Sequence, residues 1–491
     1  MSVTSDGTHG AADQTEAATL GRRSLGVADI VFFVVAASAP LTVVAGGVPT
    51  SFAVTNLVGI PLVYVVIAVI LVVFAVGYAA MSRHVANSGA FYTYVSKGLG
   101  QAWGVAAALV ALVAYNAMQV GIFGLYGFAA SAALEQFLGV HASWWICALV
   151  TVAIIAILGQ LQVDLNARVL ALFLILESVV VVVFDIAGVV KPAEGLSVEP
   201  FLPAALGGGA LGAALCFVTA SFVGFESAAI YGEECKNPQR TVARATYTAV
   251  IIIGVFYALS AWATVMAVGK SQIIGKSQEL TAGLLFVYAE QNVGKWFADI
   301  ATVLFVTSLF AALLSFHNAV ARYFFSLGRE RVLPNQLARV NTKGAPAAGS
   351  LTQTAIAVVL IGVFAILGKD PVLSLFAWLT NVGALGVIFL MALSSVAVVV
   401  YLRRHSNVTE STVSHEIAAV VASIALFIVF GLAVNNFDAL VGTTTGDPLN
   451  WILPGLIVAS AVVGLIYGLV LKRSRPNVYA LVGRGGDSAP S

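Results

Sequence analysis

The chain carries, at residues 219–231, the stretch TASFVGFESAAIY, inside an apolar segment that begins near Gly208. Glu226 lies in this stretch, and an ionisable group at membrane depth is costly enough to indicate a functional site. Gly224 weakens the helix beside it, since glycine costs about 1 kcal/mol relative to alanine in a helix interior. Interrupted helices are tolerated at this depth only where they pack against protein or line a cavity. We therefore expect a binding site built from the backbone around Gly224.

The composition predicts an all-α integral membrane protein. Of the 491 residues, 60% are hydrophobic and 10% are charged. Residues 30–82 contain no Asp, Glu, Lys or Arg, which is enough for two membrane crossings of about 20 residues each. Twelve spans are predicted, at about residues 25–47, 52–80, 99–133, 143–160, 166–191, 208–232, 242–268, 296–326, 350–367, 372–402, 414–434 and 450–471.

The cationic residues predict the orientation of these spans. With the N-terminus inside, 19 of the 24 Lys and Arg fall on the cytoplasmic side, and the five others are Lys191, Lys270, Lys276, Lys295 and Lys369. The positive-inside rule then puts both termini in the cytoplasm. The predicted surroundings are the lipid bilayer of the plasma membrane, and nothing indicates a nucleic-acid partner or a metal. The sequence contains no Walker A, HExxH or GxSxG motif, so it gives no support to an enzyme of those kinds.

A second interruption is predicted in the first span, where Pro40 follows Ala37-Ser38-Ala39. Proline removes a backbone donor and clashes with the carbonyl group one turn earlier. Pro40 and Gly224 are five helices apart, and because five is odd, two equivalent five-helix units would cross the membrane in opposite directions. Many secondary transporters have this inverted repeat, in which two broken helices meet near mid-membrane. The simpler alternative is that Pro40 only kinks its helix.

The ends of interrupted helices can bind a zwitterion. A half-helix that begins near Leu41 or Thr42 offers unpaired N–H groups and a positive dipole end, which suit a carboxylate. Carbonyl groups freed near Ala220, Ser221 and Val223 suit an ammonium group. Together they would recognise an amino acid without any charged side chain.

Three segments on the predicted cytoplasmic side carry a family pattern. They read NSGAFYTY at 87–94, GEECKNPQR at 232–240 and RYFFSLGRERVLP at 322–334. In this order, and with the two interruptions, the chain resembles permeases of the amino acid–polyamine–organocation (APC) superfamily over roughly residues 25–400. The resemblance implies a five-plus-five inverted repeat, as in the leucine transporter, that works by alternating access.

The resemblance also implies a division of the chain and a set of site residues. The implied parts are a disordered cytoplasmic N-terminus at 1–24, a first repeat at 25–191, a second repeat at 208–402, two further helices within 414–471 and a cytoplasmic tail at 472–491. The residues implied for substrate binding are Ala39, Pro40, Leu41, Thr42, Ala220, Ser221, Val223, Gly224, Phe225 and Phe316. The two phenylalanines would act as aromatic gates, with core or lipid-facing packing as the alternative for each ring. Residues 39–42 depart from the Gly-rich triplet of many relatives, which predicts a tighter carboxylate pocket.

Glu177 is the predicted coupling residue. Proton-coupled bacterial relatives often carry a lysine in the fifth span, and Glu177 stands at the matching position. A buried carboxyl group can bind and release a proton, which predicts proton coupling. The alternatives are that Glu177 holds a sodium ion, neutralises a cationic substrate or is a structural acid. The facing part of the eighth span is expected at 311–314, where hydroxyl groups are scarce, although Thr307, Ser308 and Ser315 are within about a turn. This pattern favours a proton over sodium.

Other polar residues in the spans have weaker interpretations. Glu226 either caps the second half of the sixth helix, which stabilises by about 0.3–1 kcal/mol, or forms a proton-sensitive latch. Asp185 and Asp299 are expected near the outer interface, in contact with water. His317 is expected to be a packing residue rather than a pH sensor.

These observations predict a secondary active transporter that moves an amino acid or related amine across the plasma membrane. Proton symport through Glu177, with Glu226 as a second candidate, is the first choice of mechanism. The alternatives are an exchanger, a polyamine permease in which one of these acids faces the second ammonium group, and a non-transporting sensor or accessory subunit. No cofactor is expected.

Overall fold

The computed structural model describes residues 26–82, 90–161, 167–226, 238–342, 344–405, 412–444 and 446–483. Within these ranges every regular element is a helix. The longer helices are α3 (Ile60–Ser82), α5 (Gln101–Leu138), α6 (Trp144–Gln160), α7 (Ala167–Val190), α9 (Pro238–Val268), α12 (Lys295–Arg329), α13 (Ala347–Ile366), α14 (Ala377–Arg404), α15 (Thr412–Asn435) and α17 (Leu449–Ser474). The shorter ones are α1 (Val27–Ala37), η1 (Thr42–Gly47), α2 (Val48–Thr55), α4 (Ala90–Leu99), η2 (Glu199–Phe201), η3 (Pro203–Leu206), α8 (Leu211–Ala220), α10 (Ile273–Leu280), η5 (Thr281–Gly283), α11 (Leu284–Asn292), η6 (Asn335–Ala338), η7 (Pro371–Phe376), α16 (Phe437–Val441) and α18 (Pro476–Leu481).

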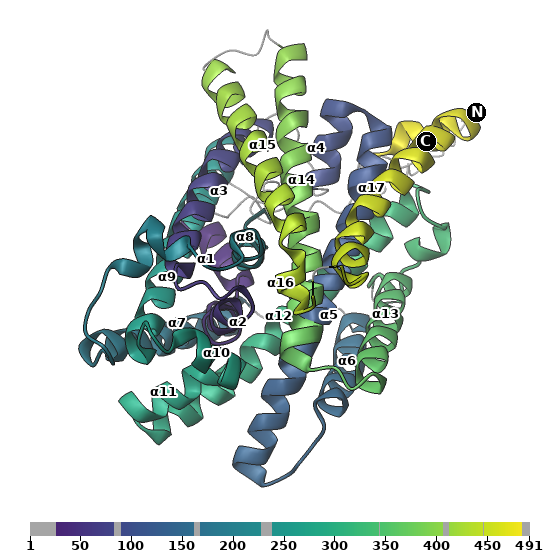
Figure 1. The fold of residues 1–491 in the computed structure, drawn as a ribbon. Helices are drawn as coiled ribbons and strands as arrows, with labels where there is room; N and C mark the ends of the chain where they lie inside the picture. The colour runs from purple at the N-terminus through teal and green to yellow at the C-terminus, as the bar shows by residue number, and fades with distance from the viewer. Residues whose placement is uncertain are drawn as a thin grey trace, which may run out of the picture.

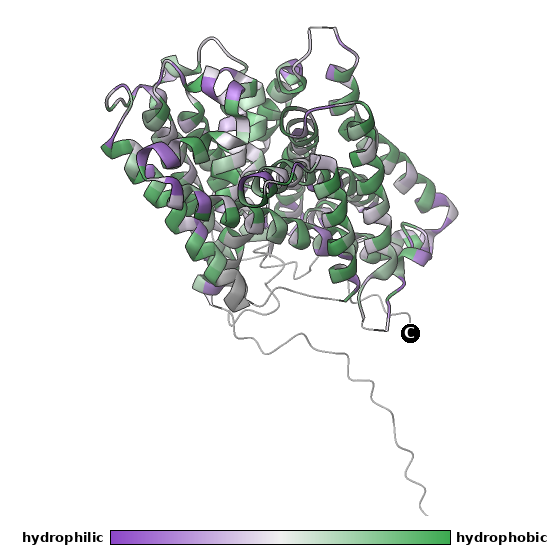
Figure 2. Ribbon diagram, turned by 90° about the horizontal axis from the view of Figure 1, so that it is seen from below, coloured by the Kyte–Doolittle hydropathy of each residue, from purple (hydrophilic) through white to green (hydrophobic). Residues whose placement is uncertain are grey.

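Nine helices in the described ranges are long and apolar enough to cross a membrane. Figure 2 shows that hydrophobic residues dominate these helices and that hydrophilic residues gather mainly at their ends and in the connections. The nine coincide with nine of the twelve predicted spans. The fourth and sixth predicted spans contain shorter apolar helices, at Trp144–Gln160 and Leu211–Ala220. A third, Thr42–Thr55, begins in the first predicted span and extends beyond its predicted end at residue 47. The all-helical membrane class is therefore confirmed.

The long helix α5 runs through the middle of the bundle (Figure 1) and packs against α12, α14 and α17. It has 38 residues and is about 57 Å long at 1.5 Å per residue, so it must tilt or project from the bilayer. Small residues bring its neighbours close. A Cβ on Gly383 of α14 would lie 2.8 Å from the Ala114 carbonyl oxygen, and one on Gly464 of α17 would lie 2.6 Å from the Ala106 Cα. Close backbone contact of this kind holds helices together in lipid, where no hydrophobic force acts between them.

Segments that are far apart in the sequence contact each other at both ends of the bundle. At one end, Arg404 of α14 donates to the Gly98 carbonyl oxygen of α4 at 3.3 Å. At the other end, Lys270 pairs with Glu199 at 2.5 Å. Each pair joins two segments that the sequence assigns to one side of the membrane, the cytoplasmic side for the first pair and the outer side for the second. In Figure 1, α4 and the C-terminal end of α14 lie at the top, and α10 and α11 lie at the bottom.

The first helix is interrupted next to Pro40. α1 ends at Ala37, and Ala39 has a φ of +46°, which an L-residue with a side chain rarely adopts. Pro40 then starts the next helical segment, where its missing N–H leaves no hydrogen bond unmade. The segment continues as the π-helical η1, in which the hydrogen bonds span one residue more than in an α-helix.

The second interruption follows α8, which ends at Ala220. The chain continues through tight turns, in which the Val223 N–H donates to the Ala220 carbonyl oxygen at 3.2 Å. Gly224 has a φ of +116°, a conformation that a side chain would strain. The predicted second half of this helix, from Glu226 to about residue 232, lies outside the described residues except for Glu226 itself.

The three family segments lie only partly within the described residues. Residues 87–89 of the first segment and 232–237 of the second fall outside them. The other parts of the first and third segments touch each other, because the Tyr92 hydroxyl donates to Glu330 Oε1 at 3.1 Å. The motif residues therefore meet at the end of the bundle that carries α4.

Candidate functional site

A cavity of about 520 Å³ lies between the two interruptions. Its wall comes from the segment around η1, from α5, from α8 and the turn after it, from α12, and from η7 and α14. The lining residues are the hydroxyl-bearing Ser38, Thr42, Ser221 and Thr380, the aromatic Phe217, Phe316 and Phe376, the aliphatic Val43, Met118, Ile122 and Val223, and the small Ala39, Gly47, Ala220 and Ala312. The two π-helical segments, η1 and η7, both contribute to this wall, as π-helical turns often do at functional sites.

Six of the ten residues predicted for substrate binding line this cavity: Ala39, Thr42, Ala220, Ser221, Val223 and Phe316. The other four, Pro40, Leu41, Gly224 and Phe225, do not. Phe225 instead packs edge-on against Phe74 of α3, with ring centroids 6.0 Å apart. Of the two proposed gates, the structure therefore brings only Phe316 to the cavity.

The polar atoms of the wall are hydroxyl and backbone groups. Ser221 Oγ shares a hydrogen bond of 3.0 Å with the Tyr64 hydroxyl, and the Tyr257 hydroxyl donates to Ser38. Thr380 Oγ1 is buried and has no hydrogen-bond partner among the described residues. Because a buried polar atom without a partner is unfavourable, Thr380 is available to a bound ligand.

The Ala220 carbonyl group is not free, which corrects one prediction. It accepts the Val223 N–H because the chain continues in i→i+3 turns after α8 instead of unwinding. No hydrogen bond to the carbonyl groups of Ser221 or Val223 is present among the described residues. Two of the three predicted carbonyl groups therefore remain available.

Glu177 of α7 lies beside the first interruption, outside the cavity wall. It is 4% exposed, and its Oε2 accepts the Ser308 hydroxyl at 2.9 Å. Ser308 in turn is 3.0 Å from Thr42 Oγ1, which does line the cavity. The Leu41 N–H also faces the Glu177 carboxylate and stabilises its charged form. Glu177 thus lies at a backbone N–H group that the sequence analysis had assigned to the substrate carboxylate.

The prediction of which part of the eighth helix faces Glu177 was wrong. The contact comes from Ser308, about one turn before residues 311–314. Three side-chain oxygens, from Glu177, Ser308 and Thr42, consequently follow one another at hydrogen-bond distance.

Asp185 and Asp299 differ from each other. Asp299 is partly exposed and accepts Gln136 Nε2 at 2.6 Å, consistent with a position near water. Asp185 is partly exposed as well, as expected, but one of its two carboxylate oxygens, Oδ1, is buried. The two acids therefore differ in the surroundings of a single oxygen.

Comparison with known proteins agrees with this architecture. The family model described as "Amino acid permease" matches residues 25–462. The chain belongs to this family. The resemblance to the APC superfamily is thereby confirmed, and the chain is a multi-pass membrane permease rather than an enzyme.

Similar curated proteins are also transporters. The branched-chain amino acid permease BcaP of Bacillus subtilis (strain 168) is 26% identical, over 83% of this permease and 86% of its own length. BcaP of Lactococcus lactis subsp. cremoris (strain MG1363) is 27% identical, over 62% and 68%. The putrescine transporter PotE of Haemophilus influenzae is 26% identical over 31% and 34%. Transport of an amino acid or amine is accordingly the activity of this permease.

Glu226 holds the second interruption of the permease against two other helices. Its Oε1 accepts the Tyr115 hydroxyl of α5 at 2.8 Å, and its Oε2 accepts the Gly224 N–H at 2.8 Å. The Tyr78 hydroxyl of α3 lies 3.4 Å from the Glu226 carbonyl oxygen. The half-helix that Glu226 was predicted to cap falls on residues outside the described ranges.

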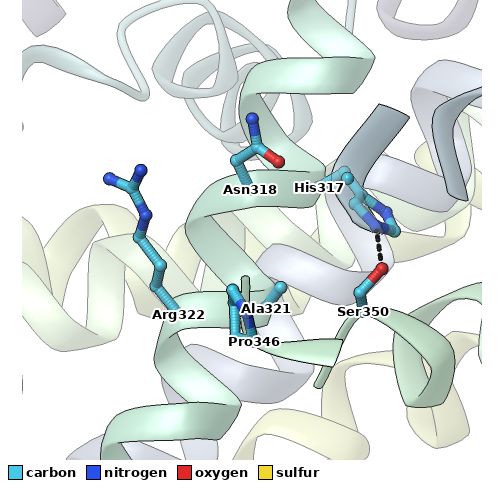
Figure 3. Close-up of a pocket in the computed structure, with 7 residues that line it drawn as sticks. His317, Asn318, Ala321, Arg322, Pro346 and Ser350 are labelled. Atoms are coloured by element: carbon cyan, nitrogen blue, oxygen red, sulfur yellow. Dashed lines mark hydrogen bonds between the residues drawn. The ribbon is translucent and has the colours of Figure 1, made fainter. Parts of the chain in front are cut away.

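A second cavity of about 300 Å³ lies at His317, between α6, α12 and α13 of the permease (Figure 3). His317 Nε2 is 2.8 Å from Ser350 Oγ. A Cβ on Gly159 would lie 2.8 Å from the same nitrogen, so only glycine leaves room for the ring. His317 therefore packs between three helices, as expected for a packing residue.

Several cavity residues of the permease could not be found from the sequence. Phe217, Phe376, Met118, Ile122 and Thr380 lie in helical segments that are apolar all round, so no periodic pattern shows which face is turned inward. Tyr257 did carry a signal, since a tyrosine in a long apolar run needs a partner for its hydroxyl group.

Proposed function

We propose that this permease imports an amino acid with an apolar side chain across the plasma membrane, coupled to protons, by alternating access. One observation carries the proposal. The wall of the 520 Å³ cavity contains hydroxyl and backbone groups but, among the described residues, no Asp, Glu, Lys, Arg or His. Such a site suits a zwitterion whose charged groups bind backbone groups and whose side chain packs against apolar side chains.

The apolar part of the wall supports a branched-chain amino acid first. Phe217, Phe316, Phe376, Met118 and Ile122 present carbon to the cavity, and each buried CH₂ of a ligand contributes about 0.8 kcal/mol. The names of the two BcaP relatives point the same way.

A polyamine is less well supported, because its second ammonium group would need an acid. Glu177 and Glu226 both lie outside the wall. The similarity to PotE covers 31% of this permease.

In the proposed complex the two ends of the zwitterion meet the two interruptions. The ammonium group donates hydrogen bonds to the carbonyl oxygens of Ser221 and Val223, which accept no other hydrogen bond among the described residues. The carboxylate approaches the backbone near Ala39 and Thr42, and Thr380 Oγ1 donates to whichever acceptor of the ligand faces α14.

Glu177 supplies the proposed coupling to protons. As an anion it sits at the positive end of the half-helix, where the Leu41 N–H faces it. A proton on Glu177 removes that charge, so the end of the half-helix becomes more attractive to the carboxylate of the substrate. Proton and substrate therefore favour each other's binding, which is the requirement for symport.

The finer architecture belongs to the same proposal. Twelve spans in a five-plus-five inverted repeat, with both termini in the cytoplasm, are supported by the interruptions at Ala39 and Gly224 and by the distribution of Lys and Arg. An exchanger built on this fold would use the same cavity without net proton movement.

Transport by purified protein in proteoliposomes tests the proposal. Radiolabelled L-leucine, L-isoleucine and L-valine should accumulate when the interior is alkaline, with or without sodium, whereas L-lysine and putrescine should not compete. Accumulation that requires sodium would overturn proton coupling, and countertransport without accumulation would indicate an exchanger. Binding of leucine without any flux would indicate a sensor, and competition by putrescine alone would indicate a polyamine permease.

A further inference from the structure

We propose that Asp185 is a second proton-binding site of this permease, at the outer end of a polar path that leads to the substrate cavity. The inference rests on the proposed proton coupling and adds to it a route by which the proton enters. Asp185 is on α7, eight residues after Glu177, which corresponds to about 12 Å along a helix.

The environment of Asp185 is that of a group able to carry a proton. Its Oδ2 accepts the Ser260 hydroxyl at 2.6 Å, while its Oδ1 is buried without a partner among the described residues. A carboxylate with one oxygen buried away from any cation or hydrogen-bond donor is unfavourable, even where the residue is partly exposed. A proton on Oδ1 removes the charge, so the site is built to bind one.

Polar groups on α9 connect this acid to the cavity. Ser260 is fully buried, and Tyr257 lies three residues earlier, on the same side of α9. The Tyr257 hydroxyl donates to the Ser38 carbonyl oxygen at 3.1 Å and to Ser38 Oγ at 3.0 Å. Ser38 lines the cavity at the first interruption. The hydroxyl groups of Ser260, Tyr257 and Ser38 therefore lie between Asp185 and the substrate site. No direct hydrogen bond spans the step from Ser260 to Tyr257 among the described residues, and the proposed path includes that step.

No charged group competes for the proton at this position among the described residues. The helices packed against α7 are α1, α9, α11 and α12. On the halves of these helices nearest Asp185 the ionisable side chains are Tyr257, Tyr288, Glu290, Lys295 and Asp299. None of them forms a hydrogen bond or ion pair with Asp185, whose recorded partner is Ser260.

Between Asp185 and the outer surface of the protein, the helices and the connection after α7 pack closely over a short distance. The Ala193 N–H donates to the Met266 carbonyl oxygen at 2.9 Å, and a Cβ on Gly188 would lie 2.8 Å from the Ala263 carbonyl oxygen. Hydrogen bonds from Ser271 hold the pKa of the exposed Glu194 below its ordinary value, so an ionised acid stands at the surface here. A proton arriving from this side meets Asp185 before Glu177.

The proposed transfer is a simple exchange of one proton. Water on the outer side gives a proton to Asp185 Oδ1, which forms an O–H bond and loses its charge. Transfer inward breaks that bond and regenerates the Asp185 carboxylate. The proton then crosses the cavity from Ser38 to Thr42, and passes by way of Ser308 to Glu177, which it neutralises.

Asp185→Asn tests the inference, because it preserves size and the bond to Ser260 but cannot release a proton. Wild-type and variant proteoliposomes are compared for accumulation of radiolabelled L-leucine under an alkaline-inside gradient, for leucine countertransport at equal pH, and for proton entry with a trapped pH dye. We expect the variant to lose accumulation and proton entry but to keep countertransport, and Asp185→Glu to recover both lost activities. Asp299→Asn is the matched control, since it makes the same change in a partly exposed acid at the same end, and it should behave as wild type.

Accumulation and proton entry at wild-type levels in Asp185→Asn would overturn the inference. Loss of countertransport together with accumulation would also overturn it, since Asp185 would then be a structural brace between α7 and α9. If Asp185→Asn does not fold, Ser260→Ala decides: a changed pH dependence of uptake supports the inference and an unchanged one removes it. If wild-type protein itself does not respond to the gradient, proton coupling fails as a whole, an outcome distinct from failure at Asp185 alone.

Discussion

The carboxylate of Glu177 faces the backbone N–H of Leu41, at the start of the half-helix that follows Pro40. The acid thereby places a negative charge at the positive end of a helix dipole. It also uses a donor that an amino-acid substrate would otherwise reach. This contact links the protonation of Glu177 on α7 to the availability of the Leu41 N–H at the substrate site. It can be tested by removing the charge of Glu177 while keeping the size of its side chain.

Glu177→Gln should abolish accumulation of leucine against its gradient while leaving binding partly intact. The amide keeps the size of the side chain but cannot alternate between charged and neutral forms. Loss of the charge near the helix end should also cost about 0.3–1 kcal/mol of stability. Gradient-driven uptake and a thermal-shift titration with leucine measure the two effects. Accumulation that still follows an imposed pH gradient would show that Glu177 is a structural acid.

Thr380→Val should weaken leucine binding about tenfold or less, corresponding to the 0.5–1.5 kcal/mol of one hydrogen bond. The change is nearly isosteric and removes a buried hydroxyl group that has no partner among the described residues. Thr352→Val is the control, because the Thr352 hydroxyl donates to its own helix at Ala348 and does not line the cavity. Equal affinities of the two variants in a binding titration would exclude Thr380 from the site.

Gly224→Val should abolish transport, although Gly224 does not line the cavity. The φ of +116° is strained for any residue with a side chain, which costs on the order of 1–3 kcal/mol. A change of backbone there would also pull the Gly224 N–H away from Glu226. Gly362→Ala is the matched control, since a Cβ on Gly362 meets no atom within 4 Å. Wild-type uptake by Gly224→Val would remove the role of this interruption.

The class and the family could be predicted from the sequence because their signals are local or additive. The hydrophobicity of a membrane span is a sum over about 20 residues, so single exceptions do not hide it. Pro40 interrupts its own helix whatever surrounds that helix. The first interruption accordingly lies at Ala39, next to this proline. The motif segments carried the resemblance before any fold was considered.

The detailed wall of the site could not be predicted, because it depends on how helices rotate and slide against one another. Thr380 and Phe376 gave no signal in an apolar run, and the helix partner of Glu177 was expected a turn away from Ser308. Asp185 is partly exposed, as expected near the outer interface, but the burial of its Oδ1 and its bond to Ser260 depend on how α9 packs against α7, which the sequence does not show.

Tyr115→Phe and Glu226→Gln, alone and together, should separate a cap from a latch. The Tyr115 hydroxyl donates to Glu226 Oε1, and a hydrogen bond to a charged group contributes about 1.5–3 kcal/mol. As a structural brace, the pair should show a coupling energy in the double-mutant cycle of thermal unfolding, with an unchanged pH dependence of uptake. As a latch, both single variants should change that pH dependence. If the double-mutant cycle shows no coupling energy and uptake by the single variants keeps the wild-type pH dependence, both roles are excluded.

Phe316→Ala and Phe225→Ala should have opposite consequences, since the structure puts one ring in the cavity wall and the other in the core. Phe316→Ala should lower leucine affinity with little loss of stability, because its ring is half-buried and faces the cavity. Phe225→Ala should cost about 3–5 kcal/mol of stability, because its ring is 1% exposed and packs on Phe74. Thermal unfolding with and without leucine measures both quantities in one experiment. If Phe225→Ala weakens binding while leaving the unliganded melting temperature unchanged, Phe225 contacts the substrate and the assignment of the wall must be revised.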